Sequence, residues 1–188
     1  MQDRFREAMR GVAATVSVLT TARGTARSGI TVSSVMSLTL DPPTICFGLR
    51  QASPFCAEMA TVGWVCVNVL SRRQEAVARA FATPPAGEHR FTAGDWTTIA
   101  AEAPQAGHPP VLLPILSGAQ ANLICRIDKT LAHGTHHLCV AEVVSVWLAE
   151  DVDPLVYCAG AYRACDTPAA IGHNERMHRH QETPHVGG

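Results

Sequence analysis

Strand-length runs of apolar or alternating residues, separated by turn-forming residues, recur along most of this chain and limit its fold more than any other feature. Extended segments are predicted, in chain order, at 14–20, 29–40, 44–49, 64–70, 119–131, 138–148 and 155–158. Two long segments, 119–131 and 138–148, meet at the short break 132–134. Helical segments do not alternate regularly with these strands, as they do in parallel βαβ sheets. We therefore expect a mainly β protein with short helices, folded as a closed or partly closed antiparallel barrel.

Short helices are predicted at three places. Apolar residues at helical spacing indicate one near 5–12, a Ser-Pro pair typical of a helix start stands at 53–54, and a capping box at 71–74 precedes another. The stretch 83–117 is rich in Pro, Ala and Gly, and we expect it to be irregular. A single domain is predicted at 1–166, followed by a loose, polar, His-rich tail at 167–188.

Composition excludes several classes of partner and compartment. The chain has 188 residues, 47% of them apolar, which is enough for a core without disulfides. With 15 basic and 16 acidic residues, it has no field of one sign that would attract nucleic acid or an anionic membrane. The seven cysteines are an odd set without a C-x-x-C pair, so we expect a reduced, cytoplasmic protein. The uncharged stretch 103–125 has transmembrane length, but its four prolines predict a loop and a soluble protein.

One face of the predicted strand 29–40 is a row of small hydroxyl side chains. Because alternate residues of a strand share a face, Thr31, Ser33, Ser37 and Thr39 would lie on the same side, with Val35 among them. Small hydroxyls let a flat polar ligand lie close and offer it donors and acceptors. The alternative is an ordinary polar strand face in contact with water.

A second feature combines Arg50 with Ser53, at the start of the predicted helix. A helix N-terminus presents free N–H groups and the positive end of the helix dipole, and together these form a typical phosphate site. The alternative is an ordinary capped helix without a ligand.

Three histidines at 133–137 and Cys139 lie close together in the sequence, but their spacing matches no standard zinc site and we predict no metal centre. His136, at the start of a strand, either lines a pocket as a hydrogen-bond donor or has a structural role. Asn68 stands alone in an apolar strand, where an unpaired amide would be costly. We expect it to tie neighbouring strands together rather than to face a pocket.

Motifs of self-contained catalysis and nucleotide binding are missing from the sequence: G-x-G-x-x-G after a strand, G-x-x-x-x-G-K-[ST], G-x-S-x-G and H-E-x-x-H. If the protein is an enzyme, a cofactor therefore supplies the difficult chemical step.

Several segments, in order along residues 3–164, resemble one family. The segment 29–43, GITVSSVMSLTLDPP, is similar to the flavin-binding strand of that family. Further similar segments are found at 5–10, 13–21, 67–71, 74, 81–82, 134–136, 141–143, 154–157 and 160–162. The family is the short-chain flavin reductases, the reductase components of two-component flavin monooxygenases.

The resemblance implies an antiparallel Greek-key split β-barrel that forms a homodimer and binds FMN or FAD in a groove near the subunit interface. It also implies that NADH or NADPH reduces this flavin, which then diffuses to a separate monooxygenase. Two alternatives share the same residues: a flavin-binding electron carrier without turnover of free flavin, and a flavin-mediated reductase of ferric iron or another metal complex.

Position by position, the resemblance assigns contacts with the flavin ring and ribityl chain to five hydroxyl residues, Thr31, Ser33, Ser34, Ser37 and Thr39. Arg50, Ser53 and the helix N-terminus that follows would hold the phosphate. His136 would be the catalytic residue beside the nicotinamide. The family has Asp before this histidine, whereas this chain has Thr135, which leaves the choice between NADH and NADPH open. Tyr162 would approach the flavin from the C-terminal segment.

Overall fold

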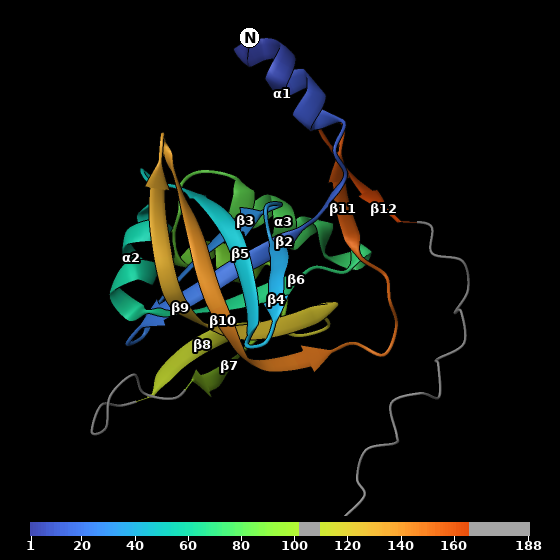
Figure 1. The fold of residues 1–188 in the computed structure, drawn as a ribbon. Helices are drawn as coiled ribbons and strands as arrows, with labels where there is room; N and C mark the ends of the chain where they lie inside the picture. The colour runs from blue at the N-terminus through green and yellow to red at the C-terminus, as the bar shows by residue number, and fades with distance from the viewer. Residues whose placement is uncertain (102–109, 166–188) are drawn as a thin grey trace, which may run out of the picture.

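A seven-stranded antiparallel sheet forms the body of the protein (Figure 1). The computed structural model describes residues 1–101 and 110–165, so the predicted tail lies outside the described residues. Along the sheet the strand order is β3-β2-β6-β9-β10-β5-β4. The strands are β2 (Ser17–Arg23), β3 (Ala26–Val32), β4 (Met36–Leu40), β5 (Pro43–Arg50), β6 (Trp64–Val69), β9 (Ala121–His133) and β10 (His136–Leu148).

The two longest strands, β9 and β10, form the hairpin that the sequence predicts. Gly134 lies in the turn with a φ of 55°, a left-handed conformation that glycine adopts without steric cost. The other edge of β10 pairs with β5, so that His136 lies opposite Arg50. The register of these three strands therefore places the start of β10 beside the end of β5.

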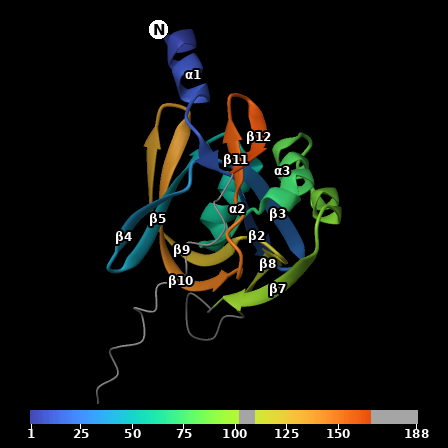
Figure 2. The ribbon, with the colours of Figure 1, turned by 90° about the vertical axis from the view of Figure 1, so that its right-hand side faces the viewer.

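The prediction of one continuous strand over 29–40 is wrong. The segment divides into β3 and β4, which are the two opposite edges of the main sheet. Only residues 33–35 connect Val32 with Met36, and four residues span at most about 14 Å. The sheet must therefore curl until its edges approach each other at this end. In Figure 2, β4 and β5 lie on the left of the curled sheet and β2 and β3 on the right.

The curled sheet confirms the predicted antiparallel, mainly β architecture. Within the described residues, β3 and β4 do not pair with each other, so hydrogen bonds do not close a barrel. A further small sheet joins β1 (Ala14–Thr15), β11 (Leu155–Cys158) and β12 (Ala161–Ala164), of which β12 was not predicted.

The prediction that 83–117 is irregular is also wrong for the described part of that stretch. It contains a 3₁₀-helix, η2 (Glu88–Thr92), and a strand pair, β7 (Trp96–Ala101) with β8 (Val111–Leu116). Pro114 argued against a strand because proline cannot donate a ladder hydrogen bond. Within the described residues β8 pairs with β7 alone, so its other edge tolerates a missing donor. On that edge the Pro114 carbonyl accepts a hydrogen bond of 2.6 Å from Thr20 Oγ1.

The predicted helices are confirmed as α1 (Gln2–Arg10), α2 (Pro54–Val62) and α3 (Glu75–Ala82), the last preceded by the short 3₁₀-helix η1 (Arg72–Gln74). The capping interaction at η1 is a hydrogen bond of 3.0 Å from Ser71 N–H to Gln74 Oε1. Both views show α1 standing away from the sheet, and none of its residues is buried (Figures 1 and 2). Among the described residues, no helix is both long and apolar enough to span a membrane.

The main core lies inside the curve of the sheet, where Leu19, Phe47 and Val65 pack against Met59 of α2. A second cluster, which includes Phe81 of α3, lies between the sheet, α3 and η2, and a third lies between β6, β9 and the β7–β8 pair. These cores fix α2 and α3 on the sheet. The candidate site lies where the start of α2 and the end of α3 meet β3.

Asn68 forms the buried link between strands that the sequence predicts. Its Nδ2 donates hydrogen bonds of 2.9 Å to Val18 O and 3.1 Å to Thr20 Oγ1. Its Oδ1 accepts hydrogen bonds of 2.8 Å from both Leu116 N–H and Asn122 Nδ2. The side chain thus joins β2, β6, β8 and β9 and has a structural role.

Candidate functional site

A cavity of about 270 Å³ lies between β3, the start of α2, the end of α3 and η2. Residues 28–30 of β3 form one wall, and residues 53–55 at the start of α2 form another. Phe81, Pro84 and Arg90 contribute to the remainder. The lining is mostly apolar, and it contains Ser53, one of the residues predicted to bind phosphate.

The wall formed by β3 and Phe81 is tightly packed. A Cβ at Gly29 would lie only 2.6 Å from Phe81 Cε1 and 3.1 Å from Leu19 O, so only glycine fits here without displacement of the ring. The ring itself is fixed by edge contacts with Phe91, at a centroid distance of 5.0 Å, and by a tilted contact with Trp96, at 5.2 Å. The cavity therefore has a rigid aromatic side against which an apolar ring system can pack.

The N-terminus of α2 opens on the cavity without a side-chain cap. Ser53 has the extended backbone of an N-cap residue, but its hydroxyl forms no capping hydrogen bond. Pro54, the first helical residue, has no N–H to offer. The hydroxyl of Ser53 and the positive end of the helix dipole are consequently available to an anionic ligand.

Arg90 lines the same cavity and was missed from the sequence. It is only 7% exposed, with Nη1 donating to Gly29 O at 3.0 Å and Nη2 donating to Thr83 O at 2.7 Å. Its Nε is buried and has no hydrogen-bond partner in the part of the chain that the structure describes. Burial lowers the pKa of the guanidinium, although an arginine stays charged at neutral pH. The only hint in the sequence is its isolation, since no other arginine occurs between Arg79 and Arg126.

Two of the predicted hydroxyl residues follow the cavity wall along the chain, one on β3 and one on the crossing to β4. Thr31 follows the cavity wall directly, and its Oγ1 donates to Ala78 O at 2.7 Å, which attaches β3 to α3. Ser34, on the crossing between β3 and β4, accepts a hydrogen bond of 3.1 Å from Gly48 N–H. Ser33 is exposed on the same crossing. Each hydroxyl oxygen retains acceptor capacity toward a ligand.

Hydrogen bonds connect the end of β5 with the predicted nicotinamide site. Gln51 N–H donates to Thr135 O at 3.0 Å, and Gln51 Nε2 donates to His136 O at 3.1 Å. Thr135 Oγ1 lies 2.9 Å from His136 Nδ1, so the threonine that replaces the family's aspartate contacts the ring. The strand register and the short link 50–53 thus place His136, Arg50 and Ser53 on neighbouring segments.

Of the predicted site residues, Ser53 alone lines the cavity, and Ser37, Thr39 and Tyr162 belong to other elements. Ser37 and Thr39 lie on β4, opposite the first half of β5, and Thr39 Oγ1 accepts a local hydrogen bond of 3.2 Å from Asp41 N–H. Tyr162 packs on β12 beneath the Arg79 guanidinium, 5.0 Å from the ring centroid, and burial raises the pKa of its hydroxyl. The structure therefore places Ser53 in the cavity lining and Thr31 next to its β3 wall, and it leaves Ser37, Thr39 and Tyr162 elsewhere.

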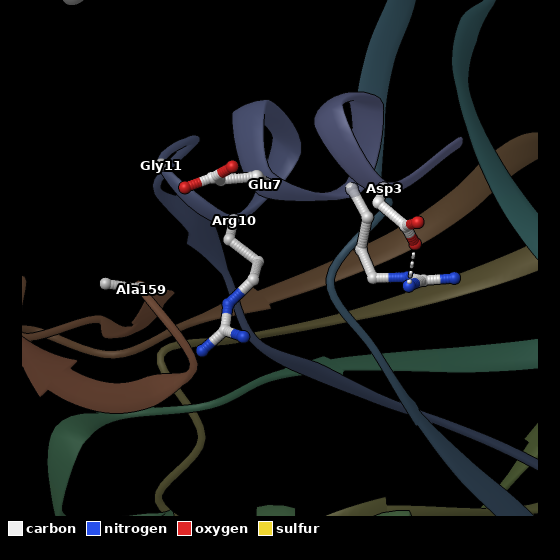
Figure 3. A pocket seen from close by; sticks show the side chains of 6 residues that line it. Asp3, Glu7, Arg10, Gly11 and Ala159 are labelled. Carbon is white, nitrogen blue, oxygen red and sulfur yellow. Dashed lines mark hydrogen bonds and ion pairs between the residues drawn. The ribbon is translucent and has the colours of Figure 1, made fainter. Parts of the chain in front are cut away.

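A second hollow, of about 430 Å³, lies beside α1 and is lined by charged side chains (Figure 3). Asp3 and Arg6 form an ion pair of 2.9 Å there, while Arg10 extends toward Ala159. It has no aromatic wall, and its charges of both signs do not select an anion. Among residues 1–101 and 110–165, no group of three or more His, Cys, Asp or Glu side chains is placed to hold a metal ion.

The cavity beside β3 fits a flavin phosphate, with apolar surface next to it for the remainder of the ligand. The observations that support this fit are the uncapped α2 N-terminus and a buried cation, Arg90, that no carboxylate of the described residues neutralises. Both features favour an anionic ligand over a neutral one.

Comparisons with known proteins identify the family. A family model described as flavin reductase like domain matches residues 9–166. The FMN reductase (NADH) RutF of Ancylobacter novellus is 36% identical over 165 residues, which cover 87% of this chain and 84% of the relative. The 4-hydroxyphenylacetate 3-monooxygenase reductase component of Pseudomonas aeruginosa is 36% identical over 169 residues, or 89% of this chain and 94% of the relative.

Solved structures give the same result. The styrene monooxygenase flavin reductase of Pseudomonas putida S12 has a TM-score of 0.73 at 26% identity, covering 88% of this chain and 99% of that one. A flavin reductase domain protein from Arthrobacter sp. FB24 has a TM-score of 0.75 at 27% identity, covering 92% and 99%. The resemblance found in the sequence is confirmed, and the chain belongs to the flavin reductase-like family.

Proposed function

We propose that the protein is an NAD(P)H-dependent flavin reductase that supplies reduced FMN or FAD to a separate monooxygenase. The observation that carries this function is the cavity beside β3, which combines an aromatic wall with an uncapped helix N-terminus and lies next to the segment that holds His136. Flavin and nicotinamide supply the redox chemistry, a hydride transfer from nicotinamide C4 to flavin N5. Relatives named as NADH-dependent FMN reductases and as a monooxygenase reductase component support the same activity.

The residues of this chain contribute by binding and alignment. The hydroxyls of Thr31, Ser33 and Ser34 would contact the flavin ring and ribityl chain, and Ser53 with Arg50 would hold the phosphate. His136 would position the nicotinamide. Hydride transfer between two aligned rings needs no general base, which agrees with a site built from neutral hydroxyls and main-chain groups.

Ser37, Thr39 and Tyr162 remain proposed flavin contacts, although they lie outside the cavity. They would reach only those parts of the flavin that extend beyond it, along β4 or toward β12.

A steady-state assay tests the proposed activity. Purified protein is mixed with NADH or NADPH and with FMN, FAD or riboflavin, and the loss of nicotinamide absorbance is followed. We expect saturable oxidation that depends on added flavin. Oxidation that is absent with every flavin and both nicotinamides would contradict the proposal.

We also propose that the protein is a homodimer with a split-barrel subunit. All five residues of β4 are exposed, among them Met36 at 58% and Leu40 at 86%, and this strand has a free edge. On α1, Phe5 is 66% exposed. Apolar surface of this kind is typical of an interface. Sedimentation equilibrium should give a mass twice that of the subunit. The variant Leu40→Lys should lower the measured mass toward that of the monomer. A monomeric native protein would contradict the dimer.

Two further assignments accompany this proposal. Residues 1–166 would form the reductase domain and 167–188 a separate tail. The protein would act in the cytoplasm, which agrees with seven cysteines that form no disulfide.

A further inference from the structure

Arg90 is a buried cation that forms no ion pair with a carboxylate of residues 1–101 or 110–165. Only 7% of the surface of this residue is exposed. None of the ion pairs between described residues includes it, and the nearest carboxylate in sequence, Glu88, pairs with Arg27 instead. A desolvated guanidinium without a carboxylate is unfavourable unless a ligand compensates it.

The hydrogen bonds of Arg90 fix the guanidinium but do not use its full capacity. An arginine has five N–H donors in one plane. Here one donor on Nη1 binds Gly29 O and one on Nη2 binds Thr83 O, while Nε has no partner. The buried Nε–H and one N–H on each Nη therefore have no partner among the described residues, and two carbonyls, one from β3 and one from the end of α3, hold the group in place.

The same cavity contains a second, independent preference for an anion. The nine-residue helix α2 begins at its edge, with the Ser53 hydroxyl not used as a cap. None of the described residues that line the cavity is acidic. The phosphate is the anionic group by which FMN and FAD differ from riboflavin, and a tetrahedral oxyanion can accept bonds from both a guanidinium and a helix N-terminus.

We infer that Arg90 is the specificity-determining residue by which this site selects phosphorylated flavins, FMN or FAD, over riboflavin. This inference rests on the proposed function and extends it to a residue that the family resemblance did not assign. Arg50, by contrast, is exposed at the end of β5, and a charge in contact with water contributes less to binding. The buried guanidinium of Arg90 thus carries most of the charge recognition.

Equilibrium titration of flavin fluorescence tests this role without reference to turnover. Wild-type protein should bind FMN about tenfold or more tightly than riboflavin, because only FMN offers the phosphate. Arg90→Gln should weaken FMN binding about 10- to 100-fold and riboflavin binding less than about twofold. Arg90→Lys, which keeps the charge but loses the planar fork, should fall between the two proteins. Inorganic phosphate should compete with FMN for the wild-type protein but not with riboflavin.

Arg27→Gln is the matched control. Arg27 pairs with Glu88 and packs over the Phe91 ring at 4.3 Å, so it contacts the same loop, but it does not line the cavity. This variant should keep the wild-type ratio of the two affinities.

Three results would overturn the inference. Equal affinity of the wild-type protein for FMN and riboflavin would show that the site does not read the phosphate. Equal losses for both flavins in Arg90→Gln would show that Arg90 only attaches the 83–90 segment to β3. If Arg90→Gln does not fold, the absence of phosphate competition in the wild-type protein would decide against the inference. A wild-type protein that binds and reduces no flavin at all would instead contradict the proposed function.

Discussion

His136 occupies the first position of β10, and its neighbours determine how its ring is presented. Thr135 Oγ1 lies 2.9 Å from Nδ1, and Gln51 fixes the main chain on either side. The second ring nitrogen, Nε2, forms no hydrogen bond with the described residues and the side chain is exposed. It can therefore exchange a hydrogen bond with the carboxamide of a nicotinamide.

We predict that His136→Ala raises the KM for NADH about tenfold, which corresponds to the loss of one hydrogen bond of about 1.4 kcal/mol. The Kd for FMN should stay unchanged, because the histidine lies outside the cavity beside β3. Steady-state kinetics and flavin fluorescence measure the two quantities separately. Thr135→Val should give a smaller rise in KM, since the ring remains but loses its orienting contact. An unchanged KM for NADH in His136→Ala would contradict the assignment.

At the scale of residues, the sequence was informative where a side chain breaks its local pattern. Asn68 in an apolar strand and Ser53 before a proline are such exceptions, and both lie at structurally important places. Arg90 follows no local pattern, because its burial depends on Gly29 O, 61 residues earlier in the chain. A partner so distant leaves no periodic signal in the sequence.

Among the elements, the strand β8 is attached to the main sheet by side chains, and Asn68 is one of them, together with Thr20 and Asn122. We predict that Asn68→Ala destabilises the protein by about 3 kcal/mol, because buried partners such as Leu116 N–H lose their bond and each costs about 1–3 kcal/mol. Urea unfolding gives the free energy of unfolding directly.

The comparison variant is Asn122→Ala, which removes the bonds of one Nδ2 group to Asn68 Oδ1 and Leu116 O. Its loss should be about half that of Asn68→Ala, since Asn68 still binds β2 and β8. Equal losses of stability in the two variants, or a loss below about 1 kcal/mol in Asn68→Ala, would contradict the role of Asn68 as the buried link between these strands.

Elements with strong local signals were predicted well, and those that depend on distant pairing were not. The β9–β10 hairpin and helix α2 follow from periodicity and start signals. The break between β3 and β4 has no such signal, because the residues on either side both favour an extended chain. The β7–β8 pair was obscured by Pro114, which is tolerated only because β8 has a free edge.

At the scale of the whole molecule, the cysteines report on how tightly the cores are packed. Five of the seven, Cys46, Cys56, Cys66, Cys125 and Cys139, are buried. Burial raises the pKa of the Cys66 thiol from 9.0 to about 12 and that of Cys139 to about 11. An aromatic disulfide reagent should therefore react rapidly with only the two others, Cys158 and Cys165, in the native protein.

These raised pKa values also set a limit to stability in alkali. The folded state favours the neutral form of each buried thiol. The contribution of these thiols to the free energy of unfolding is therefore fully present below the pKa near 9 that a thiol has in the unfolded chain. Above pH 9 the unfolded state loses protons first, and the free energy of unfolding should fall as the pH rises toward 11. Urea unfolding at pH 8 and pH 10 tests this, and a higher stability at pH 10 would contradict the buried thiols.

The curl of the sheet is a property of the whole chain that the sequence predicts only in outline. A mainly β, antiparallel fold follows from the strand pattern, but the short crossing at 33–35 brings the sheet edges together only once the pairing of all seven strands is known. The same limit applies to the site. Its hydroxyls and helix start were visible in the sequence, whereas the cavity that joins them with Arg90 is formed by three distant segments.

The central claim is that this protein turns over free flavin rather than retaining one flavin as a carrier. The direct measurement is to mix a small amount of protein with a large excess of FMN and NADH without oxygen and to follow the absorbance of oxidised flavin. We expect that nearly all the FMN is bleached, so that each protein subunit reduces many molecules of FMN. Bleaching of one flavin per subunit or fewer would contradict it.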